Sequence, residues 1–176
     1  MQTFWTRGYA ATSTQDLVDA LGINRSSLYS TFGSKDELYR RALHRYVGAD
    51  EPWVHALLDA PGPIRARLRT ALLLAVTDDL DPDRSRGCFV GNAAVERSPV
   101  DERVRKLVIG GFRSARDTFA DALTRARDRG EVSSDVDVDA LASLLLATFE
   151  GLRVVAKGSR DRRLVEQAVD AVAGMF

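Results

Sequence analysis

A short predicted helix over residues 25–32 has two chemically different sides. Leu28 and Phe32 recur at helical spacing and form an apolar side. The opposite side carries hydrogen-bonding residues, namely Arg25, Ser26, Tyr29 and Ser30. One arginine side chain can donate two hydrogen bonds to a guanine base, and a serine hydroxyl can bond a base or a phosphate. The polar side therefore predicts recognition of double-stranded DNA in the major groove.

A second predicted helix precedes this one, and a tight turn joins the two. Leu17 and Leu21 mark its apolar side, while Ser13 and Asp16 have the spacing of a capping box at its amino terminus. Gly22 follows directly, and glycine readily adopts the left-handed conformation that ends a helix. The pattern predicts a helix-turn-helix unit.

A third helix is predicted to start directly after Gly33. Ser34 and Glu37 form another capping-box pattern, and apolar residues continue at helical spacing as far as Tyr46. Helices in this order indicate a DNA-binding domain over residues 1–47.

In order and spacing, these residues resemble the DNA-binding domain of TetR-type (TetR/AcrR) transcriptional regulators. The matching positions are Gly8-Tyr9, Thr12-Ser13, Asp16-Leu17, Gly22-Ile23, Leu28-Tyr29, Phe32, Ser34-Lys35 and Leu38. The resemblance implies that several side chains lie at or near the groove, namely Arg25, Ser26, Ser27, Ser30 and Thr31. It also implies phosphate contacts from Thr12 or Ser13, from Tyr29 and from Lys35.

The helix expected ahead of Gly8 is short. Phe4, Trp5 and Tyr9 fit one or two helical turns, well below the roughly 12 to 15 residues at which isolated helices become marginally stable. In the TetR-type family this helix usually starts further upstream, often behind a basic arm. We therefore interpret the first helix as truncated, with Met1 either an internal methionine taken as a start or the result of a shortened sequence.

Composition restricts the class of protein. The chain has 176 residues, 45% of them hydrophobic, and a formal net charge of zero, which predicts a globular protein that does not bind DNA through bulk charge. No run of about 20 apolar residues and no secretory pattern occurs, so a cytoplasmic protein without membrane contact is expected. A single cysteine and two histidines without ligand spacing predict no metal and no cofactor. No enzyme motif is present either.

Beyond residue 47 only helical patterns occur, which predicts an all-α fold with a larger carboxy-terminal domain over residues 48–176. A long helix is predicted from Ser98 to about Arg129, with Ser98 as its cap. The last two helices, near residues 140–156 and 164–176, are apolar over most of their circumference. Such helices are usually buried on two sides, which favours a homodimer over a deep monomer core. The predicted interface comprises Leu144, Leu145, Leu152, Val165, Val169 and Val172.

A twofold dimer would place two recognition helices about 34 Å apart, on successive major grooves of a palindromic operator. The resemblance implies the same carboxy-terminal interface and a pocket for a small-molecule effector that releases a repressor from DNA. Residues 87–96 resemble a subgroup in which this helix packs near the pocket. The candidate lining residues are Trp53, Cys88, Phe89, Asn92, Phe112 and Phe149, each with an ordinary core residue as the alternative.

Two other functions stay open. Cys88 near a predicted helix start, beside Arg84 and Arg86, would favour a redox or electrophile sensor if its thiol is reactive, and a small buried hydrophobe if it is not. A protein-binding adaptor that has lost DNA binding would fit the short first helix.

Overall fold

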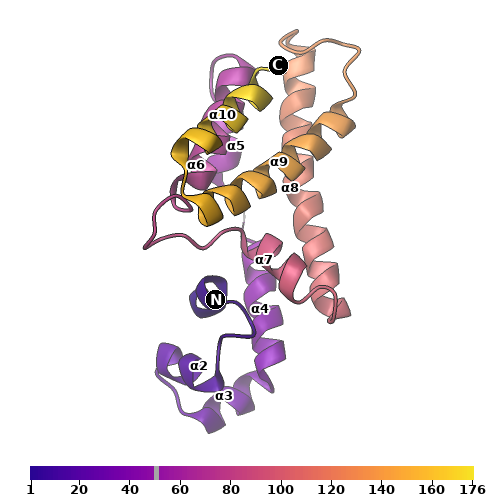
Figure 1. Cartoon of the computed structure of the whole chain (residues 1–176). Coiled ribbons are helices and arrows are strands. Elements are labelled where there is room, and N and C mark those ends of the chain that lie inside the picture. The colour runs from indigo at the N-terminus through magenta and orange to yellow at the C-terminus, as the bar shows by residue number, and fades with distance from the viewer. Residues whose placement is uncertain (50–51) are drawn as a thin grey trace. The chain divides into compact units, whose positions relative to one another are not determined.

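The computed structural model describes residues 1–49 and 52–176, without the side chains of residues 52 and 53 (Figure 1). The described chain is helical and contains no strand, which confirms the predicted all-α class. Its helices are α1 (Gln2–Arg7), α2 (Thr14–Leu21), α3 (Arg25–Phe32), α4 (Lys35–Val47), α5 (Pro52–Leu58), α6 (Ile64–Thr77), α7 (Phe89–Glu96), α8 (Glu102–Asp128), α9 (Val138–Ser159) and α10 (Arg162–Ala173). No helix among these residues is long and apolar enough to cross a membrane.

The helices form two compact units. One comprises residues 1–49 with Cys88–Gly111, and the other comprises residues 52–87 with Phe112–Phe176. The predicted boundary at residue 47 lies close to the first division. Residues 88–111 were expected in the carboxy-terminal domain, but they belong to the first unit because α7 and the start of α8 pack on its amino-terminal helices.

Aromatic side chains form much of the core of the first unit. The Phe4 and Phe89 rings both pack edge-to-face on Tyr39, with centroids 5.1 and 5.6 Å away. Gly111 brings α8 close to this core, since a Cβ on it would lie 3.1 Å from a Val90 methyl and 3.2 Å from a Val47 methyl. Segments distant in sequence therefore share one apolar core.

Local sequence signals set the first helices as predicted. Ser13 and Asp16 form a complete capping box at α2, and Gly22 ends that helix in the left-handed conformation with φ 64°. Asn24 caps α3 by accepting a hydrogen bond from the Ser27 amide at 2.8 Å. These caps fix the turn that separates α2 from α3.

The start of α8 differs from its prediction. The helix begins at Glu102 and not near Ser98, because Asp101 takes the capping role. One Asp101 carboxylate oxygen accepts hydrogen bonds from the amides of Arg103 and Val104 at 3.0 and 3.2 Å. Residues 97–100 form a turn ahead of the helix.

Two arginines are tied into the second unit. Arg67, 6% exposed, donates to the Leu58 carbonyl at 2.6 Å and to the Glu131 carboxylate at 2.9 Å. Arg153 donates to Asp79, which is 1% exposed, at 2.9 Å. These bonds satisfy charges that would otherwise be costly to bury.

Candidate nucleic-acid interface

The predicted recognition helix, α3, presents its polar side to solvent. Leu28 is completely buried beneath it, whereas Arg25, Ser26, Tyr29, Ser30 and Thr31 are exposed. Ser27 is half-buried, so its side chain is less accessible than the others. The order of buried and exposed residues in α3 therefore agrees with the predicted division of its sides.

Arg25 is the first residue of α3. Among the described residues its side chain has no hydrogen-bond or ion-pair partner, so its guanidinium keeps all of its donors. Tyr29 is held differently, because its hydroxyl lies 3.2 Å from the hydroxyl of Thr14 at the start of α2. The Tyr29–Thr14 hydrogen bond links α3 to α2 on an exposed surface.

Thr12 and Ser13, the two alternatives for a phosphate contact ahead of α2, differ in exposure. Thr12 is 0% exposed and its hydroxyl donates to the Gly8 carbonyl at 2.6 Å, so its side chain is not available to DNA. This corrects the inclusion of Thr12 among the predicted contacts. Ser13 is exposed at the amino terminus of α2, and its hydroxyl donates to the Asp16 carboxylate at 2.6 Å within the capping box.

Lys35, the first residue of α4, is fixed by an aromatic ring. Its ammonium lies 4.2 Å from the centroid of Tyr9, which orients the side chain through a cation–π contact. The Arg97 guanidinium also lies over that ring, 4.0 Å from its centroid. The Tyr9 ring thus makes cation–π contacts with two residues that are far apart in the sequence.

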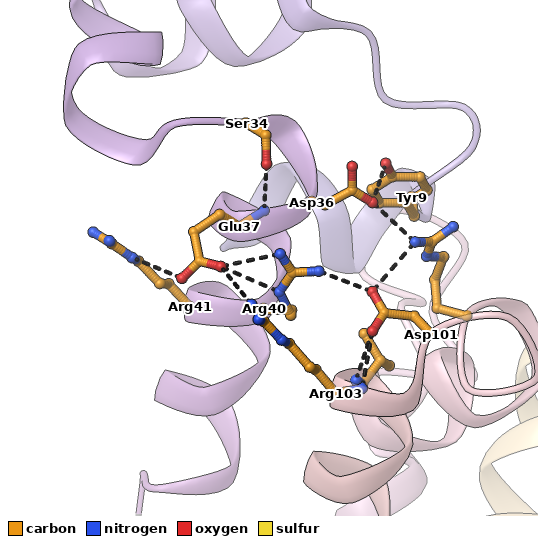
Figure 2. A network of polar contacts seen from close by, with 10 residues as sticks. Tyr9, Ser34, Asp36, Glu37, Arg40, Arg41, Asp101 and Arg103 are labelled. Atoms are coloured by element: carbon orange, nitrogen blue, oxygen red, sulfur yellow. Dashed lines mark hydrogen bonds and ion pairs between the residues drawn. The ribbon is translucent and has the colours of Figure 1, made fainter.

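A polar network links Tyr9 and α4 to the residues just ahead of α8 (Figure 2). The Tyr9 hydroxyl donates to Asp36 at 2.8 Å, and Arg97 donates to the same carboxylate at 2.9 Å. Asp36 and burial together raise the pKa of the Tyr9 hydroxyl, with burial the larger cause. Asp101 accepts from Arg40 of α4 at 3.0 Å.

Glu96, the last residue of α7, holds the loop between α1 and α2. Its carboxylate accepts hydrogen bonds from the amides of Tyr9 and Ala10 at 2.8 and 2.7 Å. Neither Glu96 nor Arg97 was predicted from the sequence, because Glu96 lies 86 and 87 residues from its partners, Arg97 lies 61 residues from Asp36, and no linear motif marks them. Their only sequence signal is the pair of charges at the end of an otherwise apolar helix.

The candidate pocket residues with described side chains divide between the two compact units. Phe89 is 1% exposed in the aromatic core of the first unit, and Cys88 and Asn92 also belong to that unit. The burial of Phe89 favours the alternative of an ordinary core residue. Phe112 and Phe149 are half-buried in the second unit. There the Phe149 ring packs on the Phe119 ring, with their centroids 6.1 Å apart. The Trp53 side chain lies outside the described residues.

Cys88 is 8% exposed and caps α7, with its sulfur accepting from the Gly91 amide at 3.4 Å. Reactive thiols are typically accessible to solvent, so this position favours the buried-hydrophobe alternative. No cluster of three metal-ligating side chains occurs within the described part of the chain.

The predicted dimer interface needs a correction. Leu145, Leu152, Val165 and Val169 are each at most 5% exposed within a single chain, so they belong to its own core. Val172 is half-buried and packs against the same core, whereas Leu144 is 41% exposed. The prediction failed because the two helices bury these residues against α5, α6 and α8 of the same chain.

The helices α2 and α3 are capped, bury their apolar sides and expose a polar side on α3. This arrangement is typical of the helix-turn-helix of a DNA-binding regulator. A family model described as bacterial regulatory proteins, tetR family, matches residues 1–42, and one described as tetracyclin repressor-like, C-terminal domain, matches residues 65–172. The chain belongs to the TetR family of transcriptional regulators. Members of this family are not enzymes.

Named relatives cover nearly the whole chain. The uncharacterized HTH-type transcriptional regulator YezE of Bacillus subtilis (strain 168) is 33% identical over 171 residues, which is 97% of this chain and 88% of YezE. The HTH-type transcriptional repressor DhaR of Mycobacterium sp. (strain GP1) is 28% identical over 172 residues, 97% of this chain and 85% of DhaR.

A solved structure shows the same fold. A cysteine mutant of the TetR family regulator CifR, complexed with 26-bp double-strand operator DNA, has a TM-score of 0.85 and 29% identity, covering 99% of this chain and 91% of CifR.

Proposed function

We propose that this chain is a homodimeric repressor that binds a palindromic operator and is released by a small-molecule ligand. The observation that carries the proposal is the exposed polar side of α3, where Arg25 retains all of its donors above a completely buried Leu28. DhaR is named a repressor, and CifR was solved with operator DNA. A regulator of this kind acts on chromosomal DNA, so we place it in the cytoplasm.

Exposed apolar residues on α9 and α10 support the dimer. On α9 they lie, together with exposed small residues, at intervals of three or four residues, and one more lies on α10. They are Leu144, Val154 and Val155 of α9, with Ala147, Gly151 and Gly158 between or beyond them, and Leu164 of α10, with Met175 just after that helix. Contiguous exposed apolar surface marks interaction sites, and small residues allow two helices to approach closely. We therefore propose these residues, in place of the buried ones, as the interface.

For the effector we retain Phe112 and Phe149, both half-buried in the second unit. A ligand can release DNA only if it binds the DNA-incompetent state more tightly than the competent one. The chemical class of this ligand is left open.

A gel-shift titration on the DNA upstream of the gene tests the proposal. A DNA-binding protein should lose affinity steeply as salt rises, because counterions are released from the phosphates it contacts. A protein-binding adaptor with this fold would show no shift of the fragment at low salt, which would contradict the proposal.

A further inference from the structure

A groove in the first unit is lined mainly by cationic side chains. Its volume is about 330 Å³, and its lining residues are Glu37, Arg40, Arg41 and His44 from α4 with Arg103 and Leu107 from α8. The lining residues all belong to the same compact unit. The volume lies within the range of small-molecule sites in proteins.

One carboxylate in this groove is surrounded by three guanidinium groups (Figure 2). Glu37 accepts from Arg40 at 3.0 Å and from Arg41 at 3.4 Å, and it lies 3.9 Å from Arg103. Its hydrogen bond with Arg40 lowers the pKa of the Glu37 carboxyl, so the group is ionised at neutral pH. Within the groove lining, one carboxylate therefore lies close to three guanidinium groups.

Arg40 is the guanidinium with the most protein partners. It donates to Glu37 and also to Asp101 at 3.0 Å, and its side chain is only 19% exposed. Two carboxylates thus hold it as a fixed charge at the wall of the groove.

The other two guanidiniums keep donors for a ligand. Arg41 uses only its Nε on Glu37, and Arg103 is too far from Glu37 for a hydrogen bond. Their side chains are 55% and 75% exposed. His44 is exposed and its ring has no partner among the described residues, which gives a further possible donor.

We propose that this groove binds a small organic anion with at least two negative charges, carried by carboxylate or phosphate groups. Arg41 and Arg103 donate paired hydrogen bonds to it, since guanidinium geometry matches both kinds of oxyanion. Glu37 repels the anion and sets its affinity. The site goes beyond operator binding and does not depend on it.

The ligand would act next to the recognition helix. The Arg41 guanidinium lies 5.7 Å from the ring centroid of Phe32, the last residue of α3. An anion that draws Arg41 toward the groove competes with this cation–π contact.

Isothermal titration of the full chain with citrate and with inorganic phosphate, at constant ionic strength, tests the site. Arg103→Ala should weaken binding about tenfold, the equivalent of one charge-assisted hydrogen bond. Glu37→Gln should strengthen binding several-fold, because it removes the repelling charge.

Arg105→Ala is the matched control, since Arg105 is an exposed α8 arginine that pairs with Glu102 outside the groove. Binding of citrate alone would indicate a carboxylate ligand, and binding of phosphate alone a phosphate ester.

Three results would overturn the site. They are no heat with either anion, equal binding by Arg103→Ala and Arg105→Ala, and weaker binding by Glu37→Gln. A smaller salt dependence of DNA binding in Arg103→Ala would instead assign the groove to the DNA backbone and would also overturn the small-anion proposal. If the wild-type chain did not bind an operator, these titrations could still succeed. The anion site and the proposed repressor function are therefore tested independently.

Discussion

Arg25 has the position and the free donors that direct base recognition requires. It starts α3, it is exposed, and the Asn24 cap fixes the first turn from which it projects. Ser26 and Ser30 are exposed on the same helix, but the Ser30 hydroxyl already donates to the Ser27 carbonyl at 3.1 Å. We therefore expect base specificity from α3 to depend more on Arg25 than on Ser30.

Replacing Arg25 with alanine should cost about 1 to 3 kcal/mol of binding free energy on the cognate operator and should relax preference at one base. Fluorescence anisotropy with the operator and with single-base variants measures both effects. Arg113→Ala, which removes an exposed arginine of the second unit, is the control. Equal weakening on every sequence would make Arg25 a phosphate contact and not a base contact.

Among the elements, α7 contacts the loop ahead of α2 through Glu96, its last residue. Glu96 binds two loop amides, and Gly8 in that loop has φ 80° with a Cβ position only 3.1 Å from the Glu96 carboxylate. A side chain at Gly8 would both strain the backbone and displace Glu96. Both the positive φ and the Glu96 contact therefore favour glycine at this position.

Glu96→Ala should lower the free energy of unfolding by about 1 to 3 kcal/mol, because two amides lose their acceptor and one of them is partly buried. Chemical denaturation of the full chain measures this change. Glu102→Ala, at an exposed carboxylate paired with Arg105, should stay within about 0.5 kcal/mol of the wild type. A Glu96→Ala protein as stable as that control would show that the loop does not need Glu96.

Caps and turn residues in the sequence predicted most helix boundaries, but they carry no information about which distant segments pack together. The Ser13–Asp16 box, Gly22 and the Asn24 cap act within four residues, so the α2–α3 turn follows from sequence alone. The start of α8 was misplaced because Ser98-Pro99 and Asp101 are both good starts. The tertiary ion pair of Asp101 with Arg40 and its local pair with Arg97 favour the second.

In the whole molecule, hydrophobic pattern alone could not separate core from interface. Leu145 and Leu144 are neighbours on an apolar helix, yet the first is 1% and the second 41% exposed. Likewise Thr12 and Ser13 are adjacent hydroxyls of which only Ser13 is exposed. The first distinction depends on how α6, α8 and α9 pack, and the second on the fold of the loop in which Thr12 bonds the Gly8 carbonyl. No single segment encodes either.

If the exposed apolar residues of α9 and α10 form the dimer, Val154→Asp should give a monomer in analytical ultracentrifugation. Val154 is 69% exposed, so the folded chain should tolerate the charge, while a dimer interface would have to bury it unpaired. Val100→Asp, at a residue that is 73% exposed outside these helices, is the matched control and should leave the dimer intact. A Val154→Asp protein that sediments as the wild type does would exclude Val154 from the interface.

Selection of bound sequences from a random double-stranded DNA pool tests operator recognition by the dimer most directly. The account predicts an enriched inverted repeat whose half-sites are centred about one helical turn, or a whole number of turns, apart. Arg25→Ala should enrich the same repeat with one base pair of each half-site relaxed. Enrichment of a single unrepeated site, or of no sequence at all, would contradict the account.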